Sequence, residues 1–67
     1  MASFEVQIPA KRRLDVEEAL DMDYGIEASV ESVREGRWVI NVAGERRSTQ
    51  TAVEQVLAKF GGKIIEN

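Results

Sequence analysis

The chain has 67 residues, with nine basic and twelve acidic side chains and a formal net charge of −3. This length predicts one domain, residues 1–67, and the negative charge disfavours nucleic-acid binding driven by overall charge. It contains no cysteine and no histidine, which excludes disulfides, thiolate metal sites and histidine chemistry. No run is apolar enough to cross a membrane and no secretory leader is recognisable, so we expect a cytoplasmic protein without a membrane partner.

The first predicted element is a strand over residues 3–8. Its apolar residues Phe4, Val6 and Ile8 alternate with the polar residues Glu5 and Gln7. A period of two is typical of a strand with one buried face and one exposed face. The proline that follows, at position 9, lacks a backbone donor and ends the strand.

A helix is predicted to follow within "LDVEEA". Asp15 is the expected N-cap, Glu18 completes a capping box, and Leu14 with Ala19 forms a hydrophobic staple. The helix ends near residue 24, where Gly25 can take a left-handed conformation. On this interpretation residues 11–13 lie in a loop before the helix, although the helix could begin one turn earlier.

The segment from residue 25 to residue 44 predicts a β-hairpin. A three-residue loop at positions 34–36, with Gly36 in the left-handed position of a bulge, sets Ser32 opposite Trp38 and Val30 opposite Ile40. All apolar pairs then share one face, with Trp38 in the core. A two-residue turn would mix the two faces, because a slip of one residue reverses every side chain.

A second helix and a last strand complete the pattern. The helical spacing is carried by Val53, Val56, Leu57 and Phe60. Ser48, Thr49 and Thr51 are alternative N-caps, and Thr51 could form a capping box with Glu54. Lys59 followed by two glycines indicates the helix end, and residues 63–66 predict a short strand.

The element order is therefore strand, helix, strand, strand, helix, strand. It resembles the α+β ferredoxin-like βαββαβ sandwich, shared by ACT small-molecule sensors, copper-chaperone domains, RNA-recognition motifs and acylphosphatases. The resemblance implies a four-stranded antiparallel sheet of order 4-1-3-2 with two helices on one face. It covers the whole chain and rests on element order, not on a family motif, so it does not settle function.

In that architecture the segments 10–14, 34–37 and 59–63 lie at one end of the sheet. We call this the basic end, because it collects most of the basic residues. The anion-binding residues predicted there are Lys11, Arg12, Arg13, Arg34, Arg37 and Lys63, with Lys59 in the last turn. The start of the first helix adds backbone amides and a partial positive charge. The opposite end receives Asp21, Asp23, Glu27, Glu45 and Glu66, which makes the molecule a charge dipole.

The chain lacks the residues that carry the specific activities of these related families. The copper-chaperone cysteines are absent, and the first loop, "PAKRRLD", lacks the glycine-rich phosphate cradle of acylphosphatases. RNA-recognition motifs stack bases on sheet aromatics, whereas Arg37 and Val39 occupy the corresponding positions here. Asp21, Asp23 and Glu27 match no calcium loop and are expected to be a solvated acidic rim. We expect no catalytic residues, no metal and no cofactor.

These observations favour a small non-enzymatic binding or regulatory domain. Its partner would be an anionic ligand, a nucleic-acid backbone or an acidic protein bound at the basic end. One alternative is a module that self-associates, as a homodimer through a sheet edge or through Val33 and Val39 on the open face. Another is a basic end that is merely solvated, in a chain, natural or engineered, whose only evident property is its fold.

Overall fold

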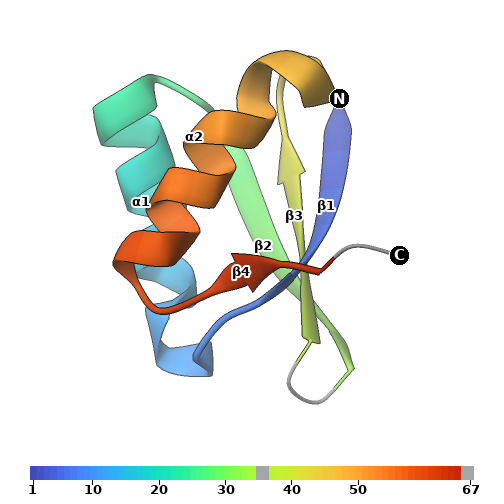
Figure 1. Cartoon of the computed structure of the whole chain (residues 1–67), viewed down its shortest axis with the longest axis vertical. Helices are drawn as coiled ribbons and strands as arrows, with labels where there is room; N and C mark the ends of the chain where they lie inside the picture. Colours follow the sequence, from blue (N-terminus) through green and yellow to red (C-terminus); the bar gives the residue numbers. More distant parts are fainter. Residues whose placement is uncertain (35–36, 66–67) are drawn as a thin grey trace.

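The computed structural model describes residues 1–34 and 37–65 of the chain. Two helices cover one face of an antiparallel sheet, with the other face open (Figure 1). The elements in chain order are β1 (Ala2–Gln7), the 3₁₀ turn η1 (Ala10–Arg12), α1 (Arg13–Tyr24), β2 (Ala28–Arg34), β3 (Arg37–Val42), α2 (Arg46–Lys59) and β4 (Lys63–Ile64). This is the βαββαβ order expected from the sequence, and the architecture is ferredoxin-like.

The four-stranded sheet has the order β2-β3-β1-β4, which is the predicted order read from the other edge. The central strand β3 pairs antiparallel with β2, placing Val30 opposite Ile40 and Ser32 opposite Trp38 as predicted. It also pairs with β1, where Phe4 is opposite Ile40. One row of apolar side chains therefore continues across three strands on the helix-covered face.

The core lies between that face of the sheet and the two helices. Its fully buried large side chains include Phe4 and Ile40 from the sheet and Leu20 and Leu57 from the helices. Trp38 is only partly buried and packs against the edge of this core. Neither helix of the described chain combines the length and the apolar character that a membrane crossing requires.

The first helix begins earlier than the capping pattern predicted. The backbone amide of Arg12 donates to the carbonyl of Pro9 over 2.9 Å, closing the turn η1, and α1 continues from Arg13 without a side-chain cap. Asp15 does not cap the helix, and Leu14 is 63% exposed, so no staple forms. Residues 10–14 are therefore helical instead of a loop, because Pro9 holds a φ of −63° that leads directly into the turn.

The central hairpin also differs from the prediction at its tip. Arg34 belongs to β2 and pairs with Arg37, and the register shifts between Ser32 and Arg34. The irregularity thus falls at Val33, and Arg34, which was expected in the three-residue loop, is a strand residue. The predicted left-handed Gly36 lies outside the described residues. The C-terminal ends of both helices agree with expectation: Gly25 adopts a φ of +66° after α1, and α2 ends at Lys59. The predicted caps of α2 were wrong, because the helix begins at Arg46, before Ser48, Thr49 and Thr51, and has no side-chain cap.

Candidate anion-binding end

The chain direction brings the three predicted basic segments to one end of the molecule. The turn η1, the tips of β2 and β3, and the connection from α2 to β4 all lie at the lower end in Figure 1. Because β1 and β2 run in the same direction with β3 between them, Arg12 and Arg37 are found at the same end. The predicted site residues thus share one end of the fold, divided between its helix side and its open face.

On the helix side, the cations are partly engaged by neighbours. The guanidinium of Arg12 pairs with the Asp15 carboxylate at 3.1 Å, one helical turn away. The guanidinium of Arg13 lies 5.8 Å from the centroid of the Trp38 ring, within range of a cation–π interaction. Lys11 is exposed and forms no ion pair with any described residue. On this side, therefore, Lys11 is free to contact an anion. Arg12 and Arg13 would have to give up the contacts with Asp15 and Trp38 to do so.

On the open face, two arginines are directly opposed. The register places Arg34 of β2 opposite Arg37 of β3. Like charges directly across a ladder are destabilising, so this pairing is an electrostatic cost to the fold. Arg37 offsets part of that cost by donating to the Glu5 carboxylate over 2.9 Å, and both side chains of that pair remain partly exposed.

Lys63 joins this open-face group from β4. It lines a shallow hollow together with Gln7, Arg37 and the last described residues of the chain. A neighbouring hollow shares Gln7 and Lys63 and is closed by the turn at residues 61–62. Lys63 is exposed and has no carboxylate partner among the described residues. Arg37 and Lys63 thus share one hollow on the open face.

Lys59 stands in the last turn of α2, as expected, and lines a hollow with Arg12, but an acidic side chain engages its ammonium group. Its ammonium group lies 3.9 Å from the Asp23 carboxylate, beyond the middle of α1, and 5.9 Å from the Phe60 ring. The side chain therefore runs back along the helix pair, away from the end. It links α2 to the acidic half of the molecule.

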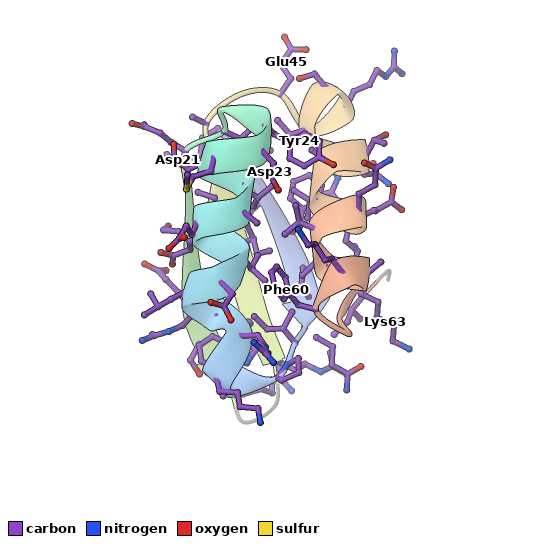
Figure 2. All side chains as sticks on the ribbon, turned by 90° about the vertical axis from the view of Figure 1, so that its left-hand side faces the viewer. Asp21, Asp23, Tyr24, Glu45, Phe60 and Lys63 are labelled. Carbon is purple, nitrogen blue, oxygen red and sulfur yellow. The ribbon has the colours of Figure 1, made fainter. Side chains whose placement is uncertain are left out.

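Three of the acidic residues predicted for the opposite end, Asp21, Asp23 and Glu45, lie there in Figure 2, with Lys63 toward the basic end. The Tyr24 hydroxyl donates to Gln55 Oε1 over 2.6 Å and joins the two helices at this acidic end. Arg46 bridges to Ser3, where its guanidinium donates to the backbone carbonyl over 2.5 Å. The predicted member Glu66 lies outside the described residues.

Two neighbours of the basic end were missed in the sequence. Glu5 alternates with apolar residues and looks like an ordinary exposed strand residue, yet it is the partner of Arg37. Trp38 was expected only to fill the core, yet its ring also lies under the guanidinium of Arg13. The contact between Glu5 and Arg37 could have been predicted from the strand register, since Glu5 is opposite Val39, two residues from Arg37 on the same face. The contact between Trp38 and Arg13 depends on where α1 begins.

The described residues contain no group of three or more acidic side chains arranged to hold a metal ion. The arrangement at the basic end offers positive charge and hydrogen-bond donors spread over a surface, which suits anion binding. Comparison of the chain with protein families, with curated proteins and with solved structures gave no match.

Proposed function

We propose that this protein is a small non-enzymatic binding domain of the cytoplasm whose basic end takes a phosphate-bearing ligand. The ligand would be a phosphorylated small molecule or a nucleic-acid backbone, which present the same phosphate chemistry. The alternative ligand is an acidic protein surface, which binds through carboxylates instead of phosphates.

The observation that carries this proposal is the direct opposition of Arg34 and Arg37. A pair of like charges across a ladder lowers stability, and nothing in the packing of the described residues requires it. An anion bound between the two guanidinium groups would reverse the sign of this interaction. Lys63 lines a hollow with Arg37 two strands away, so it would contact a second anionic group of the same ligand.

Phosphate fits these donors better than a single carboxylate does. Each guanidinium presents a planar fork of N–H donors that binds two oxygens of one phosphate, while lysine adds a point charge. Exposed contacts of this kind are individually weak and screened by salt, so binding requires several of them together. The spread of the cations over both sides of the end favours a ligand with more than one phosphate.

The test is an NMR titration of the backbone amides at low salt, using tripolyphosphate, a single-stranded oligonucleotide and a polyglutamate peptide as probes. We expect phosphate probes to shift amides of residues 10–13, 34, 37 and 61–63, with affinity falling as salt rises. Similar affinity for tripolyphosphate and the oligonucleotide indicates a compact ligand, and a much higher affinity for the oligonucleotide indicates a nucleic-acid backbone. Preference for polyglutamate contradicts the proposal.

A pair of double variants separates position from net charge. The variant Arg34→Ala/Lys63→Ala removes two cations from the basic end, and Arg46→Ala/Arg47→Ala removes two cations at the start of α2, at the opposite end. We expect the first to weaken phosphate binding about tenfold and the second to have little effect. Equal weakening by both would mean that only the overall charge matters.

Self-association through the sheet, the second function considered from the sequence, has less support. On the open face Val39 stands between Glu5 and Glu31 in the pairing register, so carboxylates separate it from other apolar side chains. Val33 is 53% exposed but is a single side chain. A concentration-independent monomer mass in sedimentation equilibrium is expected, and a salt-tolerant dimer would favour this alternative instead.

A further inference from the structure

No strand of residues 1–34 and 37–65 pairs with the outer edge of β2. The opposite edge of β2 is occupied by β3, and the carbonyl of Glu27 accepts from the amide of Ala43 at the start of the ladder. Because backbone groups alternate in direction along a strand, Ala28, Val30 and Ser32 direct their amides and carbonyls outward. We call these groups the β2 edge. Such an edge is a template for an added strand.

A carboxylate already occupies the central donor of the β2 edge. The amide of Val30 donates to Glu17 Oε2 over 2.7 Å, and Glu17 reaches it from the flank of α1. This carboxylate oxygen stands where the backbone carbonyl of an added strand would accept. Among the described residues, no side chain bonds to the other outward groups of this edge. Glu17 thus supplies one part-buried hydrogen bond to this edge, and the carbonyl of an added strand could replace it.

A hollow of about 770 Å³ lies beside the start of this edge. Its walls are α1, through Leu14, Glu17, Glu18 and Asp21, the start of β2 at residues 27–29, and, beyond them, Met1 and residues 41–43 at the end of β3. The described lining contains these carboxylates and that of Glu27 but no basic side chain. Leu14 adds an exposed apolar surface to the same wall. Figure 2 shows Asp21 on the side of α1 that faces away from α2.

We propose that the β2 edge, with the groove beside α1, binds an extended cationic segment of a partner protein by strand addition. The segment would form backbone hydrogen bonds with Ala28, Val30 and Ser32, and its carbonyl would displace the Glu17 carboxylate from Val30. Its lysine or arginine side chains would lie against Glu18, Asp21 and Glu27. Glu17, once released, would add to that negative wall.

The partner is cationic because the wall is negative, and it is extended because the unpaired groups belong to a strand. A second copy of the chain is a poorer occupant. Antiparallel pairing of two β2 edges about Val30 would bring two Glu17 carboxylates together at the twofold axis, and like charges meeting there disfavour it. This surface is separate from the basic end and has the opposite sign, so the two proposals stand or fail independently.

The experiment titrates the full chain, at low salt, with an octapeptide of alternating lysine and threonine and follows the backbone amides by NMR. The control peptide has the same charge but is N-methylated at every amide, so that neither of its edges can donate backbone hydrogen bonds to a strand. We expect the first peptide to shift the amides of Ala28, Val30 and Ser32 and the second to bind at least tenfold more weakly. Equal binding of both peptides, or no shift at the β2 edge, overturns the proposal.

Protein variants identify the two parts of the surface. The variant Glu18→Gln/Asp21→Asn is expected to weaken binding about fivefold, the effect of two exposed charge interactions. Its matched control is Glu45→Gln/Glu54→Gln, with the same charge change outside the groove and no expected effect. Ser32→Pro is expected to abolish strand pairing while leaving the β2–β3 ladder in place, since its amide points outward.

Each remaining outcome decides the question. Equal loss in both charge variants overturns the proposal, because binding would then follow net charge alone. A dimer of the unmodified chain that the peptide cannot dissociate also overturns it, since a second copy would be the occupant. If Ser32→Pro does not fold, the N-methylated peptide still tests the strand pairing, because it leaves the protein unchanged.

Discussion

The carboxylate of Glu17 accepts a hydrogen bond of 2.7 Å from the backbone amide of Val30, so a helix residue satisfies a donor on the outer strand of the sheet. A comparable contact is found where β1 extends past the two-residue strand β4: Arg46 donates to the carbonyl of Ser3 over 2.5 Å. Charged side chains on edges are one of the ways by which proteins prevent uncontrolled strand pairing. In this small sheet, Glu17 covers part of the β2 edge and Arg46 covers part of the outer side of β1.

Replacing Glu17 tests the strength of its edge contact. We expect Glu17→Ala to lower the free energy of unfolding by about 1–2 kcal/mol relative to Glu18→Ala, because only Glu17 accepts from a strand amide. Glu17→Gln retains an acceptor and should fall between the two. Urea denaturation measures the difference. Indistinguishable Glu17→Ala and Glu18→Ala stabilities would show that water replaces the carboxylate without cost.

Arg34 is expected to lower stability in the absence of ligand. Because Arg34 stands opposite Arg37, Arg34→Thr should raise the free energy of unfolding by about 0.5 kcal/mol while weakening phosphate binding. Arg37→Thr removes the same repulsion but also the ion pair with Glu5, so its gain should be smaller. Thermal unfolding at low salt measures both. Loss of stability in Arg34→Thr would contradict the repulsion between the two guanidinium groups.

The core should depend strongly on Leu57, which is fully buried in α2. Leu57→Ala is expected to cost about 2–5 kcal/mol, which approaches the whole stability of a domain of this size. Leu14→Ala is the control, since Leu14 is exposed and its truncation should change stability by less than about 0.5 kcal/mol. Circular dichroism during urea denaturation distinguishes them. A large effect at Leu14 would restore the hydrophobic staple that the structure lacks.

Gly62 is required by close backbone approach. A Cβ at this position would lie 2.5 Å from the Gln7 carbonyl oxygen, which cannot move without disturbing β1. Gly62→Ala should therefore cost about 2–3 kcal/mol and loosen β4. Gly61→Ala meets no atom but carries a φ of +81°, so its expected cost is about 1 kcal/mol. Hydrogen exchange at Ile64 and Ile65 should increase more in Gly62→Ala, and the reverse order would argue against the clash.

Much of this fold could be predicted from the sequence because local periodicity determines which side chains are buried. The alternation from Phe4 to Ile8 and the helical spacing from Val53 to Leu57 match the buried residues of the structure. The hairpin register followed from keeping Val30 and Ile40 on one face, and a shift of one residue would have exposed both. Burying apolar side chains is a requirement that each segment already displays on its own.

Tertiary structure alone decided where the charges act. The sequence predicted that the basic segments would meet, but not that Lys59 would turn toward Asp23 or that Glu5 would bind Arg37. It gave no sign that Glu17 reaches the edge of β2. Long polar side chains have many rotamers and little preference among them in water, so their partners are set by which strands and helices become neighbours. Hydrophobic periodicity therefore specifies the scaffold, whereas electrostatic contacts depend on its assembled geometry.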